Sequence, residues 1–316
     1  MADYSKDFHI AYDDDLRACT IRFRCFDTPN SVTVFGDVDE GIDVEDVLIG
    51  ARRSCLEFHR LWSFTSPESD IARINASMET VHVDSQTAAL LSAMKAFHEV
   101  ESSFDFTVGP VSFVWKHAEA VPSADELQSA LAHVGADKVL IEGDVVTKAD
   151  PFVQVDVGGA AKGFVADSIA AELRASGVKS ADIDLGGNLY MVGSHPAGRP
   201  WRVSVRVPEG ISAKVPVLEV RDQSVVTSGS YERFAEIDGV RYQHIVDAAT
   251  GLPSESDIVS ATVVSASSLQ ADMLATTALL VGTKGLDALK SRHPEADFIA
   301  ITDTGEVVGG SRIRHM

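Results

Sequence analysis

The stretch YERFAEIDGVRYQHIV at residues 231–246 indicates the class of fold, because it predicts an antiparallel hairpin. Two runs rich in β-branched and aromatic residues, 231–237 and 240–246, flank the pair Asp238-Gly239. Asp-Gly between such runs is the strongest short-range signal for a two-residue hairpin turn, since both central positions need a positive φ. The chain therefore contains at least one pair of adjacent strands that is joined without a helical crossover.

Strand and helix patterns continue on both sides of this hairpin. The other predicted strands are 19–25, 31–35, 138–142, 145–148, 152–156, 180–185, 189–192, 201–207, 215–220, 224–228, 296–301 and 306–308. The predicted helices are 43–59, 87–100, 123–134, with a capping box of Ser123 and Glu126, 162–175 and 268–281. Helices and hairpins mix without βαβ regularity, which predicts an α+β fold of antiparallel sheets with packed helices. No shift in composition marks a boundary, so residues 1–316 are expected to form a single interlocked domain.

Composition restricts the partners of this chain. Of 316 residues, 27 are Lys or Arg and 47 are Asp or Glu, so the net charge is −20 and nucleic acid is not an expected partner. Three cysteines, Cys19, Cys25 and Cys55, show neither metal-site spacing nor a disulfide framework. No apolar run reaches the roughly 18–20 residues of a membrane span, and the first residues do not read as a signal peptide. We therefore expect a cytoplasmic protein with no membrane span.

The first candidate site is VDVGGAAKGF at residues 155–164, between a predicted strand and a predicted helix. Small residues allow a ligand to approach the backbone, and free N–H groups at a helix start attract anions. Lys162 adds a positive charge there, and Asp156 offers an acceptor for a ribose or ring nitrogen. The structural alternative, a tight turn with a surface lysine, fits the pattern equally well.

The second candidate is SSLQADMLAT at residues 267–276. Ser267 and Gln270 have capping-box spacing, so a helix starts here. Asp272 and Thr276 then share one helical face and offer oxygen ligands to a hard cation such as Mg²⁺. The alternative is an Asp that caps helix N–H groups and a Thr that bonds to its own helix. We expect Asp272→Ala to leave the fold nearly intact, because a helix start lies outside the core.

The third candidate is His244 with Asp247, at the end of a predicted strand. A His beside an Asp at a strand end suits a general base. The alternative is an edge histidine followed by an Asx turn, since Asp-x-x-Thr-Gly at residues 247–251 has good turn chemistry. Two clusters of polar and small residues, 69–75 and 102–110, have no interpretation from propensity alone.

In this order, eight motifs resemble the ApbE family, the FAD:protein FMN transferases. The resemblance runs from about residue 56 to residue 301. The motifs are SDIARIN at 69–75, FDFTVGP at 104–110, DVGGAAKG at 156–163, DLGGN at 184–188, WRV at 201–203, TSG at 227–229, HIVD at 244–247 and ADMLAT at 271–276. Each motif alone is weak, but eight in order are hard to obtain by chance.

The resemblance implies an ApbE-like, T-fold-related architecture and a reaction. Family members use Mg²⁺ to transfer the FMN half of FAD to a Thr or Ser hydroxyl of a target flavoprotein, and they release AMP. By resemblance, His244 is the expected base, with Asp247 as its orienting group or an alternative base. The implied metal ligands are Asp272, Thr276 and the backbone carbonyl near Gly159. The implied FAD contacts are Thr65, Ser103, Phe104, Asp105, Asp156, Lys162, His244 and Ile245.

Two departures from the family pattern keep other functions open. Many members have Tyr in the place of Thr65, and Thr65 cannot stack on a flavin. The Met-Gly-Thr segment common near the family's N-terminus is not recognisable in residues 8–35. The alternatives are an FAD pyrophosphatase that yields FMN and AMP, and a non-catalytic FAD-binding or carrier protein.

Overall fold

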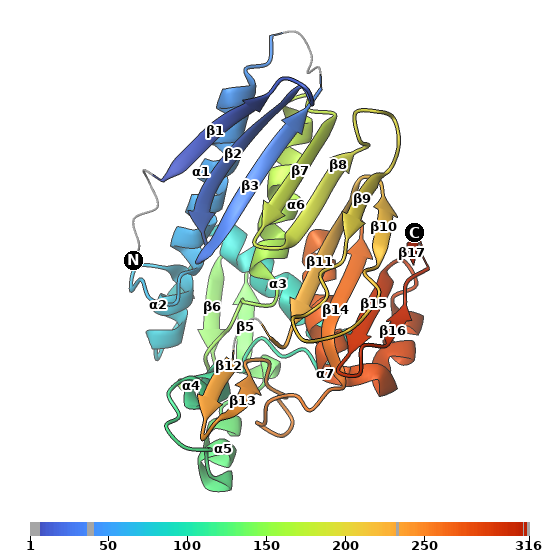
Figure 1. Cartoon of the computed structure of the whole chain (residues 1–316). Helices are drawn as coiled ribbons and strands as arrows, with labels where there is room; N and C mark the ends of the chain where they lie inside the picture. The colour runs from blue at the N-terminus through green and yellow to red at the C-terminus, as the bar shows by residue number, and fades with distance from the viewer. Residues whose placement is uncertain (1–6, 37–40, 232–233, 312, 315–316) are drawn as a thin grey trace.

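A large antiparallel sheet organises the computed structural model, which describes residues 7–36, 41–231, 234–311 and 313–314 (Figure 1). Its nine strands follow the order β1-β2-β3-β7-β8-β11-β14-β15-β16. They are β1 (Phe8–Asp13), β2 (Ala18–Cys25), β3 (Thr28–Phe35), β7 (Ser180–Leu185), β8 (Asn188–Gly193), β11 (Gln223–Gly229), β14 (Ile258–Ser265), β15 (Asp297–Thr302) and β16 (Val307–Gly309). The predicted α+β class is confirmed.

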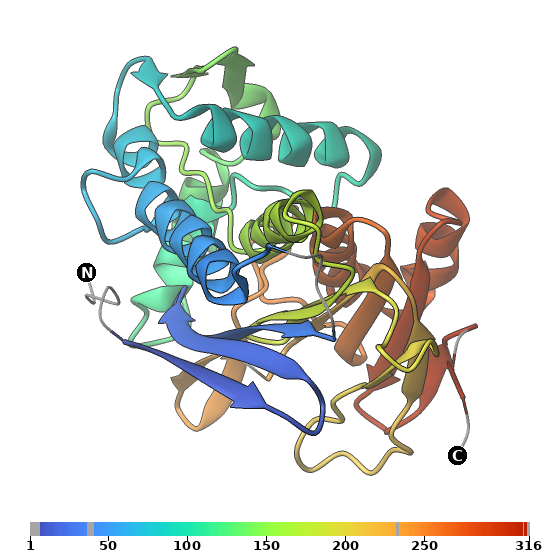
Figure 2. The same ribbon diagram turned by 90° about the horizontal axis from the view of Figure 1, so that it is seen from above.

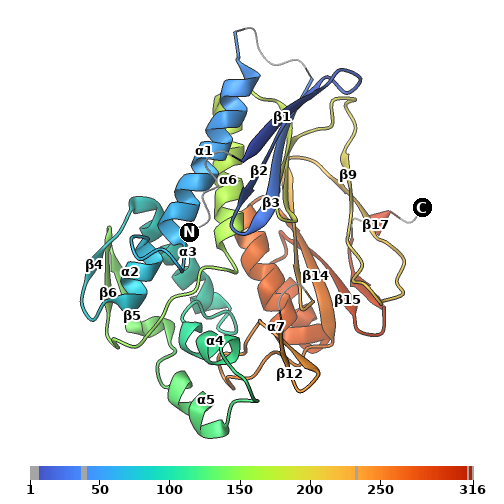
Figure 3. The same cartoon turned by 60° about the vertical axis from the view of Figure 1, so that its left-hand side comes forward.

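Three long helices cover one face of this sheet: α1 (Val44–Trp62), α6 (Ala161–Ala175) and α7 (Ser268–Arg292). Figures 2 and 3 show them side by side in one layer, and α1 contacts β2, α6 contacts β8 and α7 contacts β14. Strand β2 shows why they pack there. Its residues Ile21, Phe23 and Cys25 are buried, whereas the intervening Arg22 and Arg24 are exposed. This period of two gives the sheet one apolar face for the helices to cover.

Smaller units surround these two layers. Strands β9 (Trp201–Ser204), β10 (Val217–Val220) and β17 (Ile313–Arg314) form a separate sheet, which packs on the opposite face of the large sheet through a second apolar cluster. Strands β4 (Val81–His82), β5 (Val139–Glu142) and β6 (Val145–Lys148) form another sheet, and β12 (Phe234–Ile237) pairs with β13 (Val240–Gln243). The remaining helices are α2 (Asp70–Ala76), α3 (Ser85–Val100), α4 (Gly109–Lys116), α5 (Ala124–Leu131) and the short 3₁₀ helix η1 (Ala136–Lys138).

Several local predictions are confirmed. Asp238 and Gly239 have φ of 52° and 78°, as the turn between β12 and β13 requires. The capping box of Ser123 and Glu126 is present at the start of α5. Helix α7 continues to Arg292, but it is interrupted at Gly282, where φ is 64°. The predicted end at residue 281 thus marks a real break in the helix.

The predicted strand 152–156 is wrong. This segment makes only an isolated bridge between Gln154 and Val108, and side chains hold much of its backbone. Asn75 donates to the carbonyl of Val155 at 3.0 Å and accepts from the N–H of Val155 at 2.7 Å. Lys148 donates to the carbonyl of Val153 at 3.1 Å. These bonds replace a strand ladder, which sequence periodicity cannot show.

Other predicted strands are shorter than expected. Strand β9 ends at Ser204 instead of residue 207, and β13 ends at Gln243 instead of residue 246. The predicted strand 231–237 begins at Phe234, and residues 232–233 lie outside the described part of the chain. The chain leaves the hairpin before His244, so His244 follows the strand in an irregular segment.

Residues from both halves of the chain pack into one apolar core, and the three cysteines are buried in the protein. One apolar cluster includes Cys19 near the start of the described chain and Ala300 near its end, so both halves share a core. Cys19, Cys25 and Cys55 are free and buried. Among the described residues, no helix combines the length and the apolar character that crossing a bilayer requires.

Candidate active site

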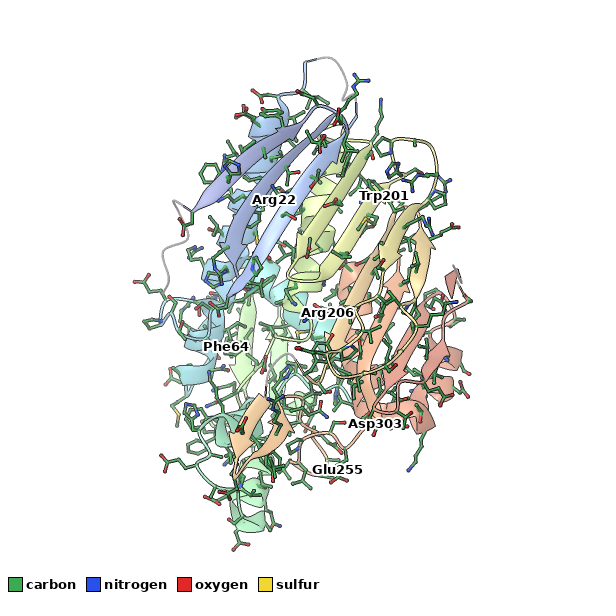
Figure 4. The ribbon with its side chains drawn as sticks, in the orientation of Figure 1. Arg22, Phe64, Trp201, Arg206, Glu255 and Asp303 are labelled. Atoms are coloured by element: carbon green, nitrogen blue, oxygen red, sulfur yellow. The ribbon has the colours of Figure 1, made fainter. Side chains whose placement is uncertain are left out.

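A cavity of about 1750 Å³ opens between the large sheet, helix α4 and the β12–β13 hairpin. Figure 4 labels two of its lining residues, Phe64 in the α1–α2 loop and Arg206 in the segment after β9. All but one of the predicted site residues line it. They are Thr65, Ser103, Phe104, Asp105, Asp156, Gly159, Lys162, His244, Ile245, Asp272 and Thr276. Segments that are far apart in the sequence therefore meet at one place.

Gly159 brings the turn before α6 against helix α7. A Cβ atom at this position would lie 3.1 Å from Oγ1 of Thr276 and 3.2 Å from the ring of Phe104. Both distances are tighter than ordinary contact, so the absence of a side chain permits the approach. The turn's backbone thus lies next to the Thr276 hydroxyl, as a shared cation site would require.

Asp272 is buried, with 4% of its surface exposed, and its carboxylate accepts a hydrogen bond from the N–H of Gly163 at 2.9 Å. Burial raises its pKa, while the charge of Lys162 and the Gly163 hydrogen bond act in the opposite direction. The expectation that Asp272 occupies a helix start outside the core is wrong. Helix α7 begins at Ser268, and its first turns pack against α6, which removes Asp272 from solvent.

Asn188 supports Asp272 from the sheet, and our sequence interpretation assigned it no role. Its side-chain oxygen accepts from Oγ of Ser268 at 2.8 Å, and that hydroxyl accepts from Oγ of Ser224 at 2.8 Å. The buried amide nitrogen of Asn188 makes no hydrogen bond of ordinary geometry, yet it lies close enough to Asp272 to lower the pKa of that carboxyl. The DLGGN motif at 184–188 was the available signal.

Asp167 joins the starts of α6 and α7. Its carboxylate accepts from the N–H groups of Ser268 at 2.7 Å and Leu269 at 3.0 Å, and from Oγ of Ser267 at 2.9 Å. Burial raises the pKa of Asp167, and these hydrogen bonds lower it. The two helices approach so closely that a Cβ atom on Gly163 would lie 2.4 Å from the carbonyl oxygen of Ser268. The last glycine of the DVGGAAKG motif is therefore required by helix packing.

Asp156 is held by its backbone. Its N–H donates to the carbonyl of Phe106 at 2.7 Å, and the preceding Val155 is held on both sides by Asn75. The carboxylate of Asp156 accepts from the N–H of Gly158 at 2.8 Å. Asn75 is the last residue of the SDIARIN motif, which propensity could not interpret. The motif thus fixes the cavity wall that carries Asp156.

The segment around Phe104 forms another wall. Asp105 accepts from the N–H of Thr107 at 2.8 Å and from its hydroxyl at 2.6 Å. That hydroxyl accepts in turn from the N–H of Gly135 at 2.7 Å. His98 Nδ1 lies 2.8 Å from the carbonyl oxygen of Phe104. These contacts set the backbone so that Ser103, Phe104 and Asp105 line the cavity.

His244 and Asp247 occupy different environments. His244 lines the cavity, whereas Asp247 is not among the residues that line it. The Asp247 carboxylate accepts from the N–H of Ala249 at 2.8 Å, which is the Asx turn of the alternative interpretation. Trp115 anchors the same turn by donating to the carbonyl of Gly251 at 2.8 Å. The geometry favours a turn-forming role for Asp247 and keeps His244 as the candidate base.

Thr65 has an aromatic neighbour that our sequence interpretation missed. Its hydroxyl lies 3.2 Å from Oγ of Ser63, and both Phe64 and Thr65 line the cavity. The side chain of Phe64 is 50% exposed, so its ring is accessible from the cavity. An aromatic surface is therefore present at the cavity one residue before Thr65.

Comparisons with known proteins identify the family of this chain. The sequence pattern of the ApbE family matches residues 26–300. An FAD:protein FMN transferase of Vibrio cholerae serotype O1 is 32% identical over 75% of this chain and 74% of its own length. One of Treponema pallidum is 37% identical over 74% of this chain and 71% of its own length. A solved flavin transferase ApbE from Vibrio cholerae superposes with a TM-score of 0.83 at 27% identity, over 94% of this chain and 98% of that one. The chain belongs to the ApbE family.

Proposed function

We propose that this protein is an FAD:protein FMN transferase, which moves the FMN half of FAD to a Thr or Ser hydroxyl of a target flavoprotein and releases AMP. One observation carries the proposal. Asp272, Thr276 and the Gly159 turn meet beside Lys162 in a cavity large enough for a dinucleotide. The named transferases of Vibrio cholerae and Treponema pallidum, both above 30% identity, support it.

The oxygen atoms at this place fit a hard cation such as Mg²⁺. Within the described chain there is no group of three or more His, Cys, Asp or Glu side chains suited to a metal. The proposed site therefore combines one carboxylate, Asp272, with the Thr276 hydroxyl and a backbone carbonyl near Gly159. The buried carboxylate, with its raised pKa, is a group that a cation would stabilise in the charged form. A bound Mg²⁺ supplies neutralising charge at the pyrophosphate.

The residues of the cavity have separate tasks in this reaction. Lys162, at the start of α6, attracts the phosphates of FAD. The acceptor hydroxyl oxygen bonds to the phosphorus of the FMN half, and the bond from this phosphorus to the oxygen shared by both phosphates breaks. That oxygen leaves with AMP, and the hydroxyl proton passes to a ring nitrogen of His244. Such proton transfer typically contributes ~10²–10⁴-fold in rate.

The decisive test is one incubation with FAD and Mg²⁺, with and without an acceptor domain, followed by mass spectrometry and nucleotide chromatography. We expect an acceptor heavier by one FMN, together with AMP. Release of FMN and AMP without acceptor would instead establish the FAD pyrophosphatase, which Thr65 favours because its hydroxyl stands where many relatives place an aromatic ring. Intact FAD in both reactions would leave the carrier function.

We propose that the protein is cytoplasmic. It is supported by three cysteines that are free and buried, as in a reducing compartment. Cell fractionation with an antibody against the protein tests it.

A further inference from the structure

Strand β9 places one edge of the small sheet at the cavity. Within the described residues, β9 pairs only with β10, because it ends the order β17-β10-β9. Figure 1 shows β9 as the strand of this sheet nearest to β8. Four consecutive residues, Val203 to Arg206, line the cavity. The second edge of β9 is therefore continuous with the proposed reaction site.

The backbone of β9 has a defined orientation at this edge. The N–H of Val205 donates to the carbonyl of Pro216 at 2.9 Å, and Val203 stands opposite Leu218. Since hydrogen-bonding direction alternates along an antiparallel strand, the backbone groups of Ser204 and Arg206 face away from β10. The side chains of Val203 and Val205 are buried in the apolar cluster, which anchors the strand. The edge is thus a fixed template for one more strand.

This region is also locally basic. Residues 199–221 contain five basic residues, Arg199, Arg202, Arg206, Lys214 and Arg221, and two acidic ones, Glu209 and Glu219, so their net charge is 5 − 2 = +3 in a chain of net −20. Arg206 is exposed, and its guanidinium carbon lies 5.5 Å from the ring centre of Tyr231, which also lines the cavity. The ring restricts the guanidinium to the cavity wall. A ligand that carries a carboxylate is therefore attracted to this edge.

The size of the cavity leaves room for a second substrate. Its volume of about 1750 Å³ exceeds the ~300–1,000 Å³ of typical small-molecule sites. A hydroxyl that must reach the pyrophosphate beside Asp272 has to enter the same space. An extended segment delivers a hydroxyl into a cavity at a lower steric cost than a folded surface does.

We infer that the acceptor protein docks as an extended segment that adds a strand to the free edge of β9, with main-chain hydrogen bonds to Ser204 and Arg206. A carboxylate of that segment, a few residues from the target hydroxyl, pairs with the Arg206 guanidinium. This mode combines main-chain affinity with side-chain selection. The inference rests on the proposed function and specifies its protein substrate.

Two pairs of variants test the two parts of the inference. Arg206→Glu reverses the charge at the cavity wall, and Arg53→Glu on helix α1, on the other face of the large sheet, is the matched control. Ser204→Pro removes the outward N–H while leaving the β9–β10 ladder complete, because proline is tolerated where an edge strand's N–H is unpaired. Ser204→Ala is its control, since it keeps the N–H. Thermal melting verifies that each variant folds.

The readouts are the KM for a small acceptor domain with an Asp near its target Thr, and the Kd for FAD. We expect Arg206→Glu to raise the KM about tenfold or more, consistent with charge pairs that select partners at an interface. An acceptor with Lys in place of the Asp should lower the KM again in Arg206→Glu, where the two charges are now opposite, and in none of the other variants. Ser204→Pro should raise the KM by about fivefold, which corresponds to the loss of about one hydrogen bond between the acceptor and β9. The Kd for FAD should change less than about twofold in all four variants, since one hydrogen bond to the nucleotide would change it more.

The following outcomes would overturn the inference. An unchanged KM in both Arg206→Glu and Ser204→Pro would exclude docking at β9. A dimer that Ser204→Pro dissociates would show that a second copy of the chain covers this edge. If the wild type transfers no FMN, the proposed function fails, and anisotropy of a labelled acceptor then tests the docking alone. Equal binding to the wild type and to Arg206→Glu in that measurement would refute it.

Discussion

Asp272 is a residue at which stability and the proposed function oppose each other. The carboxylate is buried and its pKa is raised, so its charged form lowers the stability of the folded chain. The same charge is what a cation beside Thr276 and Gly159 would bind. Asn75 and Asn188 show a second pattern at this scale, because each supports a neighbouring residue of the site: Asn75 bonds to the backbone of Val155 at the cavity lining, and Asn188 lies behind Asp272, outside the lining.

Asp272→Asn should separate these two roles. The amide keeps an oxygen acceptor for the N–H of Gly163 but loses the charge, so turnover should fall on the order of 10²–10³-fold, as for a lost electrostatic contact at a reacting group. The free energy of unfolding should stay equal or rise by up to ~1 kcal/mol, because a buried charge is removed. Kinetics and urea unfolding measure both quantities. Asp303→Asn, at the exposed carboxylate labelled in Figure 4, is the control. Full turnover in Asp272→Asn would show that Asp272 is only structural.

Phe64 should contribute to FAD binding. Its ring is half exposed at the cavity, and stacking on an aromatic ring stabilises a base by ~1–3 kcal/mol. Phe64→Ala should therefore raise the Kd for FAD by about 5–150-fold, measured by flavin fluorescence. Phe152→Ala removes a ring of similar exposure outside the cavity lining and serves as the control. Equal affinities in the two variants would mean that Phe64 does not meet the nucleotide.

At the scale of secondary-structure elements, the site depends on how α6 and α7 begin. Gly163 of α6 donates to Asp272 of α7, and Asp167 of α6 accepts from the first residues of α7. The first turns of α6 and α7 are thus joined by polar contacts, and Lys162 and Asp272 of these turns line the cavity. Helix α3 is joined to the far end of α7 in the same way, because buried Glu101 accepts from Arg292 at 2.6 Å and lies 2.8 Å from His293.

Gly163→Ala should disrupt the α6–α7 contact. The added methyl group would lie 2.4 Å from the carbonyl oxygen of Ser268 and 2.7 Å from Cα of Leu269, and these backbone atoms cannot rotate away. We expect a loss of about 2–3 kcal/mol in the free energy of unfolding, in the usual range for overpacking, and a lower kcat in the folded fraction. Gly50→Ala in α1 is the control, because no atom lies within 4 Å of its Cβ position and a helical alanine should stabilise slightly. Equal stabilities of the two variants would contradict the packing argument.

The elements also show what the sequence could and could not predict. The Asp238-Gly239 turn and the Ser123 capping box depend on neighbours in the chain, so local rules found them. The strand predicted at 152–156 failed because the side chain of Asn75, 80 residues earlier, takes the hydrogen bonds of Val155. The candidate site residues came largely from the family resemblance, and all of them except Asp247 line one cavity. Asn188 and Phe64 were missed because their roles depend on neighbours that only the fold provides.

At the scale of the whole molecule, a net charge of −20 makes the placement of each acid important. Asp182 lies on β7 beside Asp184, and burial together with the charge of Asp184 raises its pKa to about 6. Between the pKa of Asp182 in the unfolded chain and its folded value of about 6, the folded chain binds more protons than the unfolded chain does. The stability that protonated Asp182 contributes is therefore lost as the pH rises from about 4 to about 6.

Asp182→Asn should remove this pH dependence. At pH 7.5 the variant should unfold with a free energy about 2–3 kcal/mol higher than the wild type, since each pKa unit corresponds to ~1.4 kcal/mol. Below about pH 3 the difference should vanish, because Asp182 is then protonated in both states. Urea unfolding across this range measures the effect, with Asp303→Asn as the control. A difference that is equal at both pH values would show that the carboxylate is not titrating as described.

The bonds between α6 and α7 also have a consequence for folding. Gly163 and Asp272 are 109 residues apart, and Asp167 reaches Ser268 across 101 residues. Contacts of such long range form late, because the loop between them must close first. During synthesis, the cavity is therefore incomplete until α7 has left the ribosome. A nascent chain that ends before α7 lacks Asp272 and Thr276, so the proposed cation site forms only after nearly the whole chain has been synthesised.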